Sequence, residues 1–202
     1  MNKGQIRAHF KALLNRTDCD DALADTFIDQ AITRIQRTLR VPSMEKTQNY
    51  AITSQVTNIV VPNDLIEIMS IYNSEYALSR VSLREMKQFQ AIGEAGTPKY
   101  FCRQGELILL YPYPANMTVS IDYYSQFPAL TTDTSSNSLT NIASDLVTYT
   151  ALSYAADYFL DERGPLFDQK AGVFITEIQE MANEAEQAGS LQSIRPHSIL
   201  EE

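Results

Sequence analysis

The sequence predicts an α+β protein: an antiparallel helical bundle built from N- and C-terminal helices, with an inserted small antiparallel β-domain and an extended C-terminal arm. Apolar residues recur at helical spacing at both ends of the chain, and short strand-prone runs alternate with turn residues between them. With 202 residues, 44% of them hydrophobic and 20% charged, the chain can bury a substantial core. We expect the bundle over residues 1–42 and 139–189, the β-domain with its linker over 43–138, and the arm over 190–202.

Two helices are predicted in the first forty residues. The segment KGQIRAHFKALL, residues 3–14, has its apolar residues at helical spacing, and residues 15–18 interrupt the pattern with cap-forming side chains. A longer apolar stripe follows between Cys19 and Arg40, with arginines near its end, where the helix dipole favours cations. Thr17 or Asp18 is the expected N-cap of this second helix.

Residues 47–127 are predicted to form five or six strands, mostly antiparallel, with one short helix that begins at Ser82. In VPNDLIEIMSIY the residues Pro62-Asn63-Asp64 are a turn between two strand-prone runs, and Gln104-Gly105 is typical of a hairpin because Gly105 accepts a positive φ. The run MTVSIDYYSQF alternates most regularly. It predicts one face of the sheet from Met117, Val119, Ile121 and Tyr123.

The segment SDLVTYTALSYAADYFLDER, residues 144–163, predicts a helix that is apolar on every face, whereas a surface helix has one apolar stripe. It is too short, and too rich in Tyr and Thr, for a membrane span, which needs about 20 largely apolar residues. The helix is therefore either the core of the bundle or shared between that core and a subunit interface. We favour core burial for the apolar residues, and the amphipathic side chains Tyr149, Tyr154 and Tyr158 are the candidate subunit-interface residues.

The flanking segments complete the predicted bundle. The polar run TTDTSSNSLTN, residues 131–141, is linker-like, and Gly164-Pro165 separates the apolar helix from a last helix that reaches about residue 188. After Gly189 the helical pattern fails in SLQSIRPHSILEE. Its isolated apolar residues fit a disordered end and a docking arm equally well. The candidate arm residues are Leu191, Ile194, Arg195, Ile199 and Leu200.

The charge of the chain argues against a protein that wraps nucleic acid. The net charge is −9 and the pI about 4.7, whereas phosphate binding relies on clustered Lys and Arg. Residues 157–202 carry ten acidic side chains against three basic ones, and residues 1–40 carry seven basic against five acidic. Surfaces of unlike sign could attract copies of the chain to one another, although two solvated faces are the simpler interpretation.

No catalytic, cofactor-binding or metal-binding residue is predicted. The two histidines, His9 and His197, do not support a catalytic triad or a metal cluster, and no phosphate-binding glycine motif occurs. The carboxylate pairs Asp161-Glu162 and Glu177 with Glu180 are far better explained as solvated helix faces than as acid/base pairs. Cys19 lies near a helix N-terminus, which can lower a thiol pKa, but without a partner base it is interpreted, like Cys102, as a small buried hydrophobe in a reducing compartment.

Four segments, DALADTFIDQAITRIQRTLRVP, VPNDLIEIMSIY, TPKYFCRQGELILLYPYP and LVTYTALSYAADYFLDER, in this order, resemble the head-to-tail adaptor (connector) proteins of short-tailed bacteriophages. The resemblance covers residues 2 to about 188 and rests on the order of the segments along the chain. It implies a virion structural protein, made in the host cytoplasm, of which a dodecamer forms a ring between the portal protein and the tail tube or nozzle protein. DNA would pass through the channel of this ring without specific binding, and the C-terminal arm would reach into the portal assembly.

Other function classes stay open at this point. A tail-terminator or another neck protein would bind the tail tube and not the portal. A virion-associated cell-wall hydrolase would need an essential carboxylate, and no residue stands out for that role. A host-interaction module would stay a monomer whatever virion protein is added. We expect the free adaptor to be a monomer, because a ring assembled before the portal would be wasted.

Overall fold

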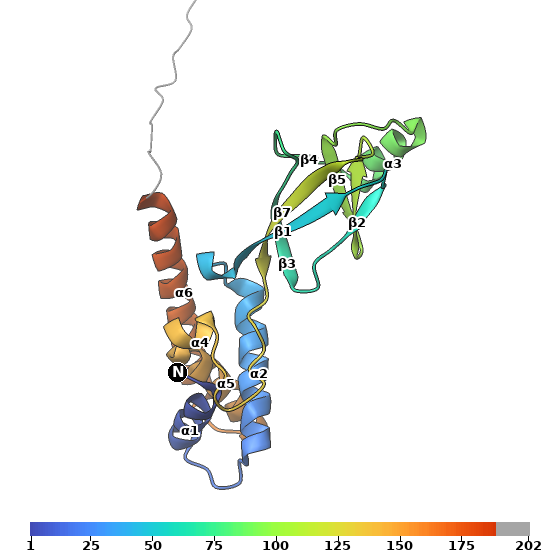
Figure 1. The fold of residues 1–202 in the computed structure, drawn as a ribbon. Helices are drawn as coiled ribbons and strands as arrows, with labels where there is room; N and C mark the ends of the chain where they lie inside the picture. Colours follow the sequence, from blue (N-terminus) through green and yellow to red (C-terminus); the bar gives the residue numbers. More distant parts are fainter. Residues whose placement is uncertain (189–202) are drawn as a thin grey trace, which may run out of the picture. The chain divides into compact units, whose positions relative to one another are not determined.

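The computed structural model describes residues 1–188, with side chains up to Glu184. They form two compact units: residues 1–42 together with the chain from Pro128 onward, and residues 43–127 (Figure 1). The first unit is helical, and the second consists mainly of antiparallel strands. The predicted α+β class, with a β-domain inserted into a helical bundle, is confirmed.

The helical unit is a bundle centred on α5. Its helices are α1 (Lys3–Leu14), α2 (Asp21–Thr38), α4 (Ser138–Ile142), α5 (Ser144–Phe159) and α6 (Gly164–Ala188). Helix α5 packs against α1, α2 and α6 (Figure 1). Two contacts occur in the same order along α2 and α6. Arg34 pairs with Asp168 at 2.7 Å. Further along both segments, the Gln179 side chain bonds the backbone N–H and C=O of Arg40, just after α2, at 3.0 and 2.8 Å. Helices α2 and α6 are therefore parallel to each other, with α5 antiparallel to both.

The start of α2 differs from the prediction. Its N-cap is Asp20, whose carboxylate accepts a hydrogen bond from the backbone N–H of Leu23 at 2.7 Å. The sequence also offered Thr17 and Asp18, but the Asp18 carboxylate accepts two hydrogen bonds from the guanidinium of Arg16, at 2.9 and 2.7 Å. Because its carboxylate is bonded to Arg16 in the loop, Asp18 does not cap the helix, and Asp20, the next capping residue along the chain, does.

Helix α5 is enclosed by its own chain over most of its length. Leu146, Val147, Ala151, Leu152 and Ala155 are fully buried although they point to different sides of the helix. Two of its buried hydroxyls bond within the helix: Thr148 donates to the carbonyl of Ser144 and Ser153 donates to that of Thr150, each at 2.8 Å, whereas the buried hydroxyl of Thr150 has no partner among the described residues. Core burial of the apolar residues, the favoured interpretation of the sequence, agrees with the structure.

The polar segment before α5 is not a free linker. Its backbone carbonyls at Asp133 and Ser135 accept hydrogen bonds from the N–H groups of Gly4 and Lys3, both at 2.9 Å. The Asp133 carboxylate pairs with Arg7 at 2.7 Å, and Asn137 caps α4. Ser/Thr-rich composition predicted a linker because it favours irregular backbone, but these hydrogen bonds fix that backbone against the start of α1.

The β unit has more strands than the five or six expected. In the described chain it contains seven: β1 (Glu45–Ile52), β2 (Asn58–Val60), β3 (Leu65–Tyr72), β4 (Ser79–Arg80), β5 (Tyr100–Gln104), β6 (Leu107–Tyr111) and β7 (Met117–Ser125). They form one sheet in the order β1-β7-β3 and a second in the order β2-β6-β5-β4, with only β4 and β5 parallel. A 3-10 turn, Pro42–Met44, precedes β1, and α3 (Leu83–Ile92) lies between β4 and β5. The two-residue β4 is too short to give a sequence pattern.

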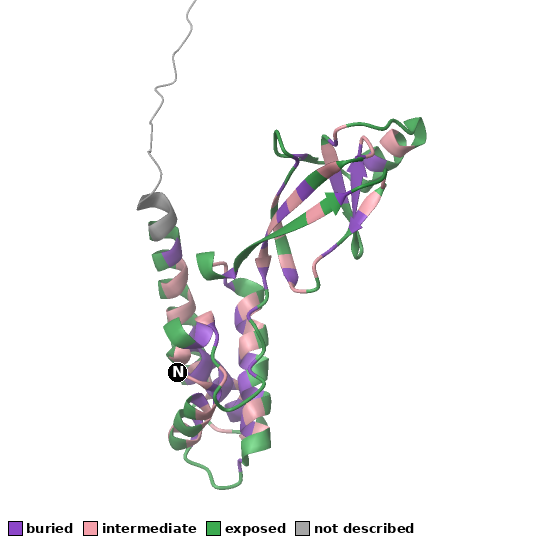
Figure 2. Cartoon of the chain, viewed as in Figure 1, coloured by how far each residue is buried: buried purple, intermediate pink, exposed green. Residues whose placement is uncertain are grey.

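The local signals in this unit are confirmed. Gly105 has a φ of 62° in the turn between β5 and β6, and Ser82 caps α3 by bonding the N–H of Glu85 at 3.2 Å. Along β7 the residues Val119, Ile121 and Tyr123 are buried and alternate with more exposed ones, as Figure 2 shows for the strands of this unit. They join one apolar core with residues of both sheets.

Candidate interaction surfaces

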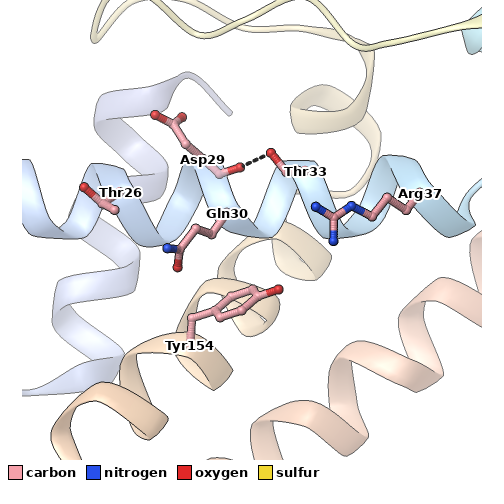
Figure 3. Close-up of a pocket in the computed structure, with 6 residues that line it drawn as sticks. All are labelled: Thr26, Asp29, Gln30, Thr33, Arg37 and Tyr154. Carbon is pink, nitrogen blue, oxygen red and sulfur yellow. Dashed lines mark hydrogen bonds between the residues drawn. The ribbon is translucent and has the colours of Figure 1, made fainter. Parts of the chain in front are cut away.

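Tyr154 lies in a groove between α5 and α2. The groove has a volume of about 460 Å³ and is lined by Thr26, Asp29, Gln30, Thr33, Arg37 and Tyr154 (Figure 3). The tyrosine is half-buried, and the guanidinium of Arg34 lies 6.0 Å from its ring centre while it pairs with Asp168. The ring thus forms the α5 side of the groove and presents part of its surface to solvent.

The α2 side of this groove is polar and built from short side chains. The hydroxyls of Thr26 and Thr33 donate to the carbonyls one turn earlier, those of Ala22 at 3.0 Å and Asp29 at 2.9 Å, so their methyl groups are left as contact surface (Figure 3). The Asp29 carboxylate is exposed, with Lys3 at 3.9 Å as its only nearby cation in the part of the chain described. Arg37 is exposed and, among residues 1–184, has neither an ion pair nor a hydrogen bond. We call this surface the α2 face: Thr26, Asp29, Thr33, Arg37 and Tyr154.

Tyr149 lies in a second groove, between α5 and α6. This groove has a volume of about 440 Å³ and is lined by Tyr149, Leu166, Gln169, Lys170, Val173 and Phe174. The Tyr149 ring is 5.7 Å from that of Phe174, and the Lys170 ammonium is 4.8 Å from its centre. Leu166 and Val173 are each 49% exposed. Half-exposed aliphatic side chains around a covered aromatic ring are an apolar contact surface.

Tyr158 occupies a third place, near the end of α5. It is 62% exposed, and its ring contacts those of Phe27 at 5.7 Å and Phe159 at 4.8 Å. Leu160 follows it with 90% of its surface exposed and a left-handed φ of 55°. The three candidate interface tyrosines therefore have different neighbours: Tyr154 and Tyr158, one turn apart on α5, lie on the side of α2, and Tyr149 lies on the side of α6.

The candidate arm residues Leu191, Ile194, Arg195, Ile199 and Leu200 lie outside the described residues, as does His197. His9 is exposed on α1. In the described chain no group of His, Cys, Asp and Glu side chains is placed to hold a metal ion. A search of the same residues finds no helix with the length and apolarity of a membrane span.

The carboxylate and thiol singled out by the sequence are in environments that oppose acid/base or nucleophilic chemistry. Hydrogen bonds from Arg163 lower the pKa of Asp161 to about 2, so its carboxyl has no proton to give at neutral pH. The same guanidinium donates to the carbonyls of Leu13 at 3.3 Å and Leu14 at 3.0 Å, which end α1. Cys19 is buried, and burial raises the pKa of its thiol, so its interpretation as a small buried hydrophobe agrees with the structure.

The Asp161–Arg163 pair predicts a pH dependence. The folded pKa of Asp161 is about 2, below its ordinary value of 3.8, so its contribution to stability is complete above about pH 4 and disappears as pH falls through about 2. Asp161→Asn should lower the urea midpoint at pH 7, and the difference from wild type should shrink toward pH 2.5. Glu162→Gln, at the exposed neighbouring position, is the control and should change little. A difference for Asp161→Asn that is constant over this range would contradict the assignment.

Comparison with known protein families supports one of the classes left open by the sequence. The family model described as SU10 adaptor protein matches residues 1–198 of this chain. The chain belongs to the SU10 adaptor protein family. The resemblance to phage head-to-tail adaptors is thereby confirmed, and the protein is a phage adaptor, a structural rather than a catalytic class and a virion component. A search of curated proteins found no match.

Sequence reasoning assigned no interaction to four residues of the adaptor's exposed helix faces, although it placed Glu177 on a solvated face: Asp29 and Arg37 on α2, and Lys170 and Glu177 on α6. All four are exposed. Their spacing of seven or eight residues along a helix was readable, because residues so spaced share a face. Such charges on one helix are ordinary, however, and only the packing of α2, α5 and α6 shows that the two faces are on different sides of the bundle.

Proposed function

We propose that this adaptor forms a ring between the portal protein and the tail tube or nozzle protein and continues the channel through which DNA passes. The family match over residues 1–198 is the observation that carries the proposal. Twelve copies, as a dodecamer, would match the symmetry that the resemblance implies for the portal. In this arrangement the bundle that contacts neighbouring copies consists of residues 1–42 and 139–189. The inserted β-domain with its linker consists of residues 43–138, and the arm consists of residues 190–202.

The charge of the adaptor supports a channel function. With a net charge of −9 per copy, a ring of many copies is strongly acidic as a whole. Wall lysines and arginines would bind phosphates by releasing counterions and would hold the duplex in place. An acidic wall repels the phosphates instead, so DNA can slide past without specific binding.

The bundle supports contacts on more than one side. Tyr149 and Tyr154 each line a groove, on the α6 and α2 sides of α5, and Tyr158 is exposed near its end. Tyrosine is enriched at protein interfaces because its ring is apolar and its hydroxyl tolerates water. A ring subunit needs two different contact surfaces, one for each neighbour. The three tyrosines are therefore proposed as subunit-interface residues.

The test is the mass of the adaptor by light scattering, alone and after mixing with the portal ring encoded by the same genome. We expect a monomer alone and a fixed number of added copies on the portal. No change in the mass of the portal would overturn the portal-binding role. If the same protein then bound the tail tube, it would be a tail-terminator or another neck protein.

A further inference from the structure

The α2 face has a counterpart on the far side of α6. Asp168 and Gln179 mark the side of α6 that is turned toward α2, through their bonds to Arg34 and Arg40. Lys170 lies two residues after Asp168 and Glu177 two residues before Gln179. Each is thus rotated by about 200° around the helix axis from the side facing α2. Lys170, Val173 and Glu177 therefore form a face, here called the α6 face, that is turned away from α2.

Among the described residues, the charges of both faces have few partners. In the described part of the molecule Arg37 and Glu177 have no ion pair, and Lys170 contacts only Tyr149, at 3.5 Å between the ammonium and the hydroxyl. Asp29 has only the distant Lys3. Two faces on one subunit, each with an exposed positive and an exposed negative side chain, can complete each other across a contact between copies.

The order and spacing of these charges match in one orientation only. Along α2 a negative residue precedes a positive one, Asp29 then Arg37, with a rise of about 12 Å. Along α6 the positive residue comes first, Lys170 then Glu177, with a rise of about 10.5 Å. When two copies lie with their helices parallel, Asp29 faces Lys170 and Arg37 faces Glu177. If one copy is inverted, Arg37 meets Lys170 and Asp29 meets Glu177, and both pairs repel.

Two bonds inside one chain relate the levels of α2 and α6: Arg40, two residues after the end of α2, bonds Gln179, and Arg34 pairs with Asp168. Measured from Arg40 and Gln179, Thr33 and Val173 lie at similar levels, whereas measured from Arg34 and Asp168 they are about 9 Å apart. A neighbouring copy shifted along the helix axis by no more than this distance places the half-exposed Val173 opposite the Thr33 methyl group, in the groove beside Tyr154.

We infer that the α6 face of one copy docks on the α2 face of the next, with Asp29–Lys170 and Arg37–Glu177 as the pairs that fix the parallel orientation. The two faces are different, so the contact is head-to-tail and continues from copy to copy until rotation closes it. The inference rests on the proposed ring and names the surfaces that would form it.

Charge reversal with rescue tests the contact. Arg37→Glu and Glu177→Arg each place like charges opposite each other, and each should raise the adaptor concentration needed to half-saturate the portal roughly tenfold. The double variant restores opposite charges at every contact and should recover most of that loss. Arg84→Glu on α3 and Glu162→Arg are matched controls at exposed positions, and each should leave assembly unchanged. Single variants that assemble like wild type, or a double variant worse than either single one, would overturn the inference.

A second test does not need the portal. Cys19 and Cys102 are buried, so exposed cysteines introduced as Thr33→Cys and Val173→Cys should be the ones that react. At high protein concentration under mild oxidation, the double variant should form disulfide-linked multimers, each single variant at most a dimer. Thr33→Cys with Thr176→Cys, exposed elsewhere on α6, is the control and should give fewer multimers.

The two tests separate the inference from the proposed function. Wild-type copies that bind the portal in fixed number, with unaffected charge variants and no cross-linking, would leave the ring in place and overturn the docking faces. Cross-linked multimers from a protein that never binds the portal would support the docking faces and overturn the portal role. Failure of both portal binding and cross-linking at millimolar concentration would overturn both.

Discussion

Leu152→Ala is expected to lower the free energy of unfolding of the helical unit by about 2–5 kcal/mol, because truncation of a fully buried leucine loses apolar burial and leaves a cavity. Leu152 has no exposed surface, and α5 packs against α1, α2 and α6, so few neighbours can move in to fill the space. Urea unfolding followed by the helical circular dichroism signal measures the change.

Leu160→Ala is the matched control for that result. Leu160 follows the same helix but is 90% exposed, so the same truncation should change the free energy of unfolding by no more than about 0.5 kcal/mol. Equal losses for the two variants would contradict the burial of α5 within its own chain. They would instead show that the leucines of α5 act through contacts between copies.

Deletion of residues 190–202 is expected to weaken binding of the adaptor to the portal about a hundredfold or more while the described domain keeps its fold. The reason is avidity: when many arms bind one assembly, the loss of all of them removes a multiplied contribution. Light scattering of mixtures with the portal measures binding, and circular dichroism checks the fold. A truncated adaptor that binds as well as the full chain would remove the arm from the mechanism.

Point variants can distinguish apolar docking from a simple length effect. Ile194→Ser, Ile199→Ser and Leu200→Ser together keep the arm at full length but remove the side chains proposed to fill pockets on the portal. This triple variant should behave like the deletion. A matched control, Ser190→Ala with Ser193→Ala, should bind like wild type. A triple variant with wild-type affinity would assign the effect of the deletion to the length of the arm rather than to its apolar residues.

The arm deletion and the charge reversals should affect different steps. If the charges on α2 and α6 form the proposed contacts between copies, their variants should change how many copies bind the portal and how cooperatively they bind. If the arm is the proposed portal-docking segment, its deletion should weaken the binding of each single copy to the portal. Binding curves at low occupancy should thus be sensitive mainly to the arm, and those near saturation to Arg37 and Glu177. The same effect of both on the first copy bound would contradict this division.

Local signals in the sequence were sufficient where a residue acts on its immediate neighbours. Ser82 caps α3, Gly105 turns the β5–β6 hairpin, and β7 alternates as its pattern predicts, because capping, positive φ and pleating depend on a few adjacent residues. The N-cap of α2 could not be chosen this way. The two predicted candidates were Thr17 and Asp18, the ion pair of Asp18 with Arg16 occupies one of them, and Asp20 is the cap.

The sequence alone determined the class of the fold, the apolar nature of α5 and the family, because composition, periodicity and the order of segments are properties of the chain itself. Only the tertiary structure decided which partners those residues have. It enclosed α5 in its own chain, gave Tyr149, Tyr154 and Tyr158 different neighbours, and placed the exposed charges Asp29 and Arg37 on one side of the bundle and Lys170 and Glu177 on another. Periodicity reports which residues share a face of one helix, whereas the neighbour of that face depends on packing between segments far apart in the sequence.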